Sequence, residues 1–67
     1  MNETKPLVKV RGRQHEMHAG IPVRKAMKML QITPGSHLII RNGELITDDE
    51  ILQSGDVIEL LPVISGG

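Results

Sequence analysis

The chain ends in Ser65-Gly66-Gly67, and this glycine pair before a carboxylate is the segment best suited to chemistry. Glycine has no side chain, so its backbone can pass through a narrow slot and approach a bound nucleotide closely. An α-carboxylate is ionised at neutral pH and becomes an electrophile only after activation, for example as an acyl-adenylate. The tail therefore suggests a substrate that another protein activates at Gly67.

An ordinary disordered tail is the alternative interpretation, because chain termini are often poorly ordered. The preceding residues favour the chemical interpretation. An apolar segment, residues 57–61, continues through Pro62, Val63 and Ile64 into the glycine pair. This pattern predicts a last β-strand that leads into a flexible tail at residues 64–67.

The composition indicates a small protein with an aliphatic interior. The 67 residues suffice for one domain, expected over residues 1–67, and leave little room for a substrate cleft. No Phe, Trp or Tyr is present, so Ile, Leu, Val and Met must form the core. The absence of Cys excludes disulfides and thiol catalysis within this chain. Any sulfur chemistry must therefore use the thiol of a partner.

Several motifs that would indicate other functions are missing. The N-terminus has no apolar leader, and no run of about 18 apolar residues could span a membrane, so we expect a cytoplasmic protein. Gly35 and Gly43 stand alone, and the sequence contains no phosphate-binding G-x-x-x-x-G-K-S/T loop. We therefore expect no bound cofactor and no catalytic residue in this chain.

Three histidines and one acidic run are candidate metal ligands. On an extended strand, His15 and His18 would point to opposite faces, and no cysteine assists them or His37. Residues 48–50, Asp-Asp-Glu, lack the alternating ligand spacing of a calcium loop. The sequence therefore predicts no metal site.

The net charge of zero conceals a strong partition along the chain. Residues 1–41 contain all eight basic residues and two acids, whereas residues 42–67 contain six acids and no base. A separate basic face could attract nucleic acid. The alternative is that the first and last strands pair, which places Lys9 and Arg11 near Glu59. We favour the pairing, because no aromatic residue is present to stack on a base.

The first half of the chain predicts a hairpin and a helix. Residues 7–11 alternate between apolar and basic side chains, Gly12 gives a turn, and residues 15–18 form a returning strand. The period then becomes that of a helix, which Pro22 opens and residues 33–35 close. One face of this helix is apolar and contains Val23, Ala26, Met27 and Leu30.

The second half predicts a hairpin, a short helical turn and a final strand. Residues 37–41 and 44–46 flank Asn42-Gly43, the strongest short hairpin signal, because a type I′ turn needs a positive φ at both central positions.

Residues 47–50 resemble a capped helix start that would put Ile51 and Leu52 into the core. Residues 54–56, Ser-Gly-Asp, then predict a turn into the last strand. Five short strands and one amphipathic helix make an α+β fold.

This order of elements resembles the β-grasp, or ubiquitin-like, fold, in which a mixed sheet of four or five strands packs on one α-helix. The C-terminal half is similar to the ThiS/MoaD family of sulfur carriers. The specific motifs are the Asn42-Gly43 turn, the Gly55-Asp56 turn and the tail Pro62-Val63-x-x-Gly66-Gly67. The resemblance covers nearly the whole chain.

The resemblance implies a carrier rather than an enzyme. In this family, a ubiquitin-activating-type adenylyltransferase consumes ATP to adenylate the terminal glycine, here Gly67, with Gly66 and Ser65 in the adjoining tail. A persulfide on a donor protein then supplies sulfur for a thiocarboxylate, which an acceptor synthase uses in thiamine, molybdopterin or tRNA-thiolation pathways. We expect a monomer that contacts neither nucleic acid nor membrane directly.

Two other functions remain open at this stage. A ubiquitin-like modifier would share the activation step but would be joined through Gly67 to lysines of target proteins. A β-grasp binding module would have no need of the glycine pair.

The resemblance also implies a docking face for the activating enzyme beside the tail. If Ile58 and Leu60 face the helix, strand alternation places Leu61, Val63 and Glu59 on the outer face. We expect Leu61 and Val63 to form an apolar patch. Glu59 and Arg41 are candidate polar contacts at its rim, and the alternative, which we favour, is that both are ordinary solvated charges.

Overall fold

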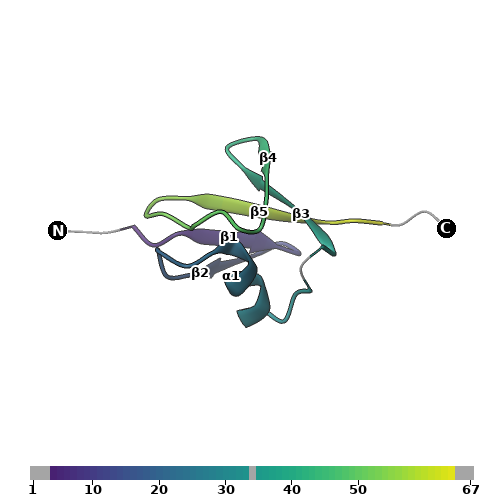
Figure 1. Ribbon diagram of the computed structural model, residues 1–67, viewed down its shortest axis with the longest axis horizontal. Coiled ribbons are helices and arrows are strands. Elements are labelled where there is room, and N and C mark those ends of the chain that lie inside the picture. The colour runs from purple at the N-terminus through teal and green to yellow at the C-terminus, as the bar shows by residue number, and fades with distance from the viewer. Residues whose placement is uncertain (1–3, 34, 65–67) are drawn as a thin grey trace.

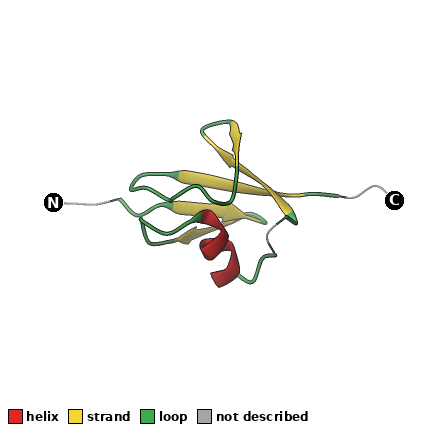
Figure 2. Ribbon diagram, in the orientation of Figure 1, coloured by secondary structure: helices red, strands yellow, loops and turns green. Residues whose placement is uncertain are grey.

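The protein folds as one mixed β-sheet with a helix packed on one face (Figure 2). The computed structural model describes residues 4–33 and 35–64. Its elements are β1 (Leu7–Val10), β2 (Arg13–Glu16), α1 (Val23–Met29), β3 (His37–Arg41), β4 (Glu44–Ile46) and β5 (Val57–Pro62) (Figure 1). The sheet order is β2-β1-β5-β3-β4. This arrangement confirms the predicted α+β, β-grasp architecture.

The central strand β5 is parallel to its neighbour β1, and every other pair in the described sheet is antiparallel. Parallel strands need a long crossover connection, and the chain between β1 and β5 supplies α1 and the β3–β4 hairpin. In the register of the central pair, Lys9 lies opposite Glu59. The predicted proximity of these opposite charges is therefore confirmed.

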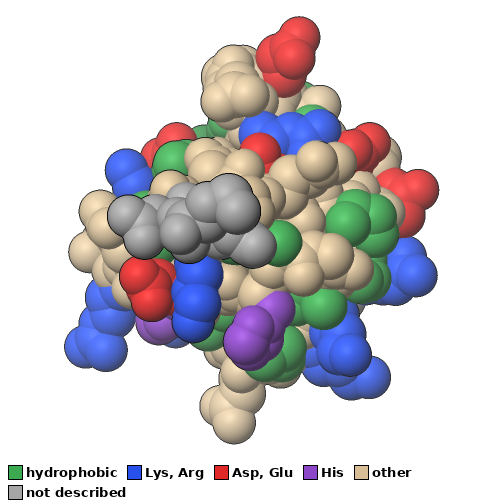
Figure 3. All heavy atoms as spheres, turned by 90° about the vertical axis from the view of Figure 1, so that its left-hand side faces the viewer, with side chains coloured by type: hydrophobic (Ala, Val, Ile, Leu, Met, Phe, Trp, Pro, Cys, Tyr) green, Lys and Arg blue, Asp and Glu red, His purple; other side chains and the backbone are tan. Residues whose placement is uncertain are grey.

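The charge partition persists in part on the surface. Figure 3 looks at the end of the molecule nearest the N-terminus, where acidic side chains lie mainly in the upper half and basic ones mainly in the lower half. Both kinds nevertheless share this surface, as expected when the basic β1 pairs with the acidic β5 in one sheet.

The first hairpin has its turn at Gly12, as predicted, but its strands pair again earlier than the sequence predicted. Its turn is Arg11-Gly12, with φ of 54° and 75°, so pairing resumes at once and Arg13 lies opposite Val10. The returning strand is therefore β2 at residues 13–16, and the prediction of residues 15–18 was wrong in its boundaries. Met17 follows the strand, donates its N–H to the Pro6 carbonyl at 2.9 Å and is buried.

Helix α1 ends in a tight hydrogen-bonded cap, before the predicted stop at residues 33–35. Gln31 takes a left-handed φ of 61°, and its N–H donates to the Lys28 carbonyl at 2.9 Å. The Ile32 N–H reaches back to the Met27 carbonyl at 2.8 Å. These two bonds form a Schellman motif, in which Gln31 occupies the position that glycine usually takes.

The segment at residues 47–50 forms a turn rather than the predicted helix start. Its carbonyl groups cap α1 instead: Val23 donates its N–H to Glu50 and Arg24 to Asp48, at 2.8 and 2.9 Å. A helix leaves its first N–H groups without internal partners, and here this loop supplies them.

The two residues that follow pair with the segment before α1, where successive side chains point to opposite faces, so only one of them is buried. Ile51 forms a bridge with Pro22 and remains 43% exposed, whereas Leu52 is 1% exposed. The prediction that both residues enter the core was therefore right only for Leu52.

The core lies between α1 and the inner face of the sheet. Val23, Ala26 and Met27 from the predicted helix face are buried, and Leu30 packs against them. The remaining buried apolar residues are Val8, Val10, Met17, Ile32, Ile39, Leu52, Ile58 and Leu60. None of the helices among residues 4–33 and 35–64 has the length and apolar character of a membrane-spanning segment.

Candidate carrier tail and docking face

The residues proposed for covalent chemistry, Ser65, Gly66 and Gly67, lie outside the described residues. The structure does describe the strand that leads to them. Along β5 the buried Ile58 and Leu60 face α1, and the intervening side chains face out, as predicted.

The outer face carries an apolar patch at the end of the sheet where β5 finishes. Leu61 is 38% exposed and lies opposite Leu38, which is 44% exposed. Val63 is 49% exposed and donates its N–H to the Ser36 carbonyl at 2.9 Å, which extends the β3–β5 ladder beyond Pro62. We call Leu38, Leu61 and Val63 the outer patch. Alternation along the last strand predicts Leu61 and Val63, whereas Leu38 was not predicted.

Leu38 could have been found from the hairpin signal. The Asn42-Gly43 turn fixes the register of β3 against β4, and alternation along β3 then assigns Leu38 and Ile40 to one face. Pairing of β3 with β5 was the missing information, because it joins segments far apart in the sequence.

Glu59 shares the outer face with Leu61, as strand alternation requires. Its neighbours across the sheet are Lys9 on β1 and Ile40 on β3. Glu59 is exposed and lies two residues before Leu61, so it borders the outer patch.

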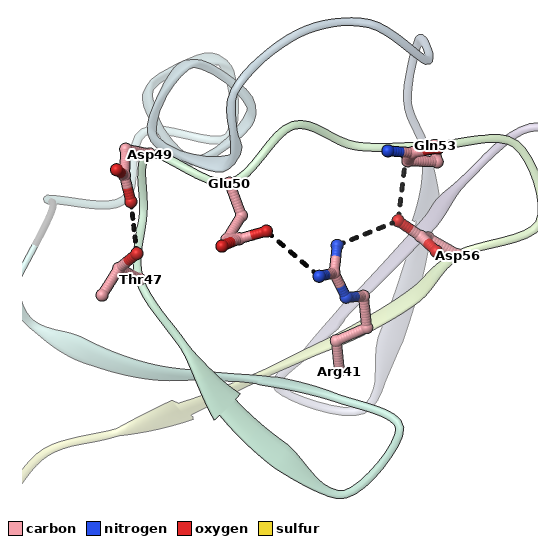
Figure 4. A network of polar contacts seen from close by, with 6 residues as sticks. All are labelled: Arg41, Thr47, Asp49, Glu50, Gln53 and Asp56. Carbon is pink, nitrogen blue, oxygen red and sulfur yellow. Dashed lines mark hydrogen bonds and ion pairs between the residues drawn. The ribbon is translucent and has the colours of Figure 1, made fainter.

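Arg41 lies on the other face of the sheet, away from the outer patch. It pairs in register with the buried Ile58, and its guanidinium reaches Glu50 Oε1 at 3.1 Å and Asp56 Oδ2 at 3.5 Å (Figure 4). The Asp56 carboxylate also accepts the Gln53 N–H at 3.0 Å. Arg41 therefore ties the loop before β5 to the sheet, and the structure does not group it with Leu61, Val63 and Glu59.

The same loop contains a second polar contact, between the Thr47 hydroxyl and the Asp49 carboxylate (Figure 4). This hydrogen bond, with a further bond from the backbone of Asp49, lowers the pKa of the Asp49 carboxyl below its ordinary value. The side chain is exposed. Its effect is therefore local to the loop.

The histidines do not form a metal centre with other described residues. Among residues 4–33 and 35–64, no group of three His, Asp or Glu side chains is arranged to hold a metal ion. His15 lies on β2 opposite the buried Val8, and His18 follows the strand and is exposed.

Comparison with protein families settles the relationship that the fold suggests. The model of the ThiS family matches residues 2–67. The chain belongs to the ThiS family.

The match includes the glycine pair as well as the sheet and helix. ThiS-family proteins have the β-grasp fold and are small sulfur carriers rather than enzymes. The family implies partnership with activating enzymes and sulfur-transfer enzymes in general. For this ThiS-family chain, the outer patch beside the tail is thus a candidate surface for such a partner.

Proposed function

We propose that this ThiS-family protein carries sulfur as a thiocarboxylate on Gly67. The observation that carries the proposal is the family match, which extends through the glycine pair. The exposed outer patch at the end of β5 supports it, because a partner that takes the tail would meet this surface.

In the first proposed step, the Gly67 carboxylate attacks the α-phosphorus of ATP in a ubiquitin-activating-type enzyme, and pyrophosphate leaves. The product is an acyl-adenylate, in which the carbonyl carbon is electrophilic. A glycine at this position leaves that carbon unhindered. The chain itself binds no cofactor in this scheme, because the partner holds the ATP.

In the second proposed step, the terminal sulfur of a donor protein's persulfide attacks the carbonyl carbon, and AMP leaves. This forms an acyl disulfide between the two proteins. A thiol then attacks the donor's sulfur, which forms a disulfide and releases the thiocarboxylate on Gly67. The chain has no Cys, so both sulfur reagents come from partners.

The thiocarboxylate then donates its sulfur to a bound intermediate on an acceptor synthase. That synthase sets the pathway, which would be thiamine, molybdopterin or tRNA thiolation. We place these reactions in the cytoplasm, where ATP and persulfide donors meet.

We further propose that the activating enzyme binds the outer patch. Leu38, Leu61 and Val63 supply exposed apolar area close to the tail, and Glu59 borders it as a polar contact. An interface core of apolar side chains with a polar rim is typical of protein partners. Arg41 holds the loop before β5 in this scheme and makes no contact with the enzyme.

Deletion of Gly66 and Gly67 tests the proposal. With the activating enzyme of the same organism, ATP–pyrophosphate exchange should depend on the intact chain and disappear with the shortened one. The two proteins should melt alike, because short terminal tails contribute little to stability. Full exchange activity without the two glycines would overturn the proposal, because Gly67 could then not be the residue that is activated.

A further inference from the structure

A basic cleft lies at the end of the molecule from which the tail leaves. It has a volume of about 640 Å³, and its polar lining residues include Arg11, Arg13, His15, Gln31, Ser36 and His37. None of the described residues that line it is acidic. It opens between the C-terminal end of α1, the first hairpin and the start of β3.

The cleft lies beside the end of β5, just before the C-terminal tail. Ser36 lines it and accepts the Val63 N–H at 2.9 Å, and His37 lies opposite Pro62 in the sheet. Arg11 and Arg13 also line a neighbouring hollow of about 380 Å³ that contains Glu59, Leu61 and Pro62. The two arginines thus stand between the basic cleft and the outer patch.

The backbone around the cleft adopts costly conformations. The described residues other than glycine with positive φ are Arg11, Gln31 and Asn42, and the first two line the cleft. The second hairpin uses Asn42 at the equivalent turn position, which is the residue type that such turns favour. Arg11 at this turn position makes the hairpin less stable than an asparagine would, and it places a positive charge at the tip of the hairpin. Strain of this kind tends to gather at functional sites.

The charges of both arginines are available to a partner. Within the described residues, Arg41 is the base that forms ion pairs, and neither Arg11 nor Arg13 forms one. Both side chains are exposed. Exposed charges around an interface mainly steer association and fix its orientation.

We propose that Arg11 and Arg13 bind carboxylate side chains of the activating enzyme, beside the channel that receives the tail. This inference rests on the proposed function, since it takes that enzyme as the partner. Arginine suits the task, because its planar guanidinium can bind a carboxylate through two hydrogen bonds.

Two other anionic ligands fit less well. Nucleic acid would be held more firmly with aromatic side chains for stacking, and the chain has none. The phosphate of an adenylate on Gly67 would lie four residues beyond Val63, and four residues of extended chain span about 13 Å. The cleft lies beside Val63, so it is too far from the adenylate to bind this phosphate. In this proposal the cleft therefore meets the surface of the enzyme around the channel and not the nucleotide bound to the enzyme.

A double charge reversal tests the proposal. Arg11→Glu/Arg13→Glu is compared with Arg24→Glu/Lys25→Glu, which changes the net charge equally in the first turn of α1 and away from both hollows. Acidic residues are favourable at a helix start, so the control should fold. The readout is ATP–pyrophosphate exchange by the activating enzyme as a function of carrier concentration, at low and high salt.

At low salt, we expect Arg11→Glu/Arg13→Glu to raise KM about tenfold and to leave kcat within about twofold of the wild-type value. The difference in KM between this variant and the wild type should become smaller at high salt. The control should keep the wild-type KM. Arg11→Asn separates binding from folding, because it should raise the melting temperature while still raising KM. An unchanged KM for the double reversal, in a wild-type system that does exchange, would overturn this inference alone.

Two further outcomes are also decisive. A gel-shift assay with bulk tRNA that shows binding by the wild type and its loss in Arg11→Glu/Arg13→Glu, with exchange unaffected, would assign the cleft to nucleic acid and overturn the proposal. Absence of exchange with the wild-type chain would overturn the proposed function, and this inference with it.

Discussion

Leu38 and Leu61 face each other across β3 and β5 on the outer face of the sheet, and both remain substantially exposed. Each lies on a central part of the sheet rather than on an edge strand. With Val63 they form an apolar surface that ends where the tail begins. This relationship puts the proposed docking surface beside the end of β5, and it leads to the first prediction.

Replacement of both leucines, Leu38→Ser/Leu61→Ser, should weaken binding of the activating enzyme. The two changes remove apolar area that would be buried at the interface, which should cost about 1–2 kcal/mol of binding free energy. This cost corresponds to a roughly tenfold rise in Kd or KM. Isothermal titration calorimetry measures the change in Kd, and exchange kinetics measures the change in KM. Met29→Ser is the matched control, because Met29 is also exposed but lies on α1. Equal effects of the two variants would argue against the outer patch as a docking site.

Arg41 should matter for stability and not for docking. Its side chain is 24% exposed and its guanidinium bridges Glu50 and Asp56, so Arg41→Ala should lower the free energy of unfolding by about 1–2 kcal/mol. Urea denaturation measures the change, with Arg24→Ala as an exposed control. The folded Arg41→Ala protein should keep the wild-type KM for the activating enzyme. A large rise in that KM with unaltered stability would return Arg41 to the interface.

Residues 51 and 52 should differ sharply in their contribution to stability. Leu52→Ala removes a buried side chain and should cost about 2–4 kcal/mol. Ile51→Ala alters a half-exposed side chain and should cost less than about 1 kcal/mol. Denaturant unfolding of both variants checks this difference. Similar losses would mean that both side chains enter the core, as the sequence alone had suggested.

Asp49 should titrate below its ordinary range. Its pKa is lowered by the Thr47 hydroxyl, so the charged carboxylate stabilises the folded loop at pH values above the unfolded pKa. This contribution is lost as the pH falls through the lower, folded pKa. NMR titration of the Asp49 carboxyl should give a low value in the wild type and a higher one in Thr47→Val. No difference between the two proteins would refute the assigned cause.

Local turn chemistry made the β3–β4 hairpin and the β5 alternation predictable. Asn42-Gly43 has the positive φ values that its residue types favour, 54° and 80°. Ile58 and Leu60 are buried because a strand alternates its side chains between two faces. In both places the signal lies within a few adjacent residues.

Long-range contacts account for the predictions that were wrong. Residues 47–50 look like a helix start, but their carbonyl groups are used by the first turn of α1, which is more than 20 residues earlier in the chain. The partners of Arg41 lie nine and fifteen residues further on, with no local pattern to indicate them. The early start of β2 follows from an arginine in a turn position that its residue type does not favour.

Sulfur carriage on Gly67 is tested most simply by the intact mass of the protein from its own cells, taken without reduction or alkylation. We expect a species in which sulfur replaces one carboxylate oxygen, localised by fragmentation to Gly67. A tail found only as the free carboxylate, together with branched peptides that join Gly67 to lysines, would contradict this expectation and identify a protein modifier instead.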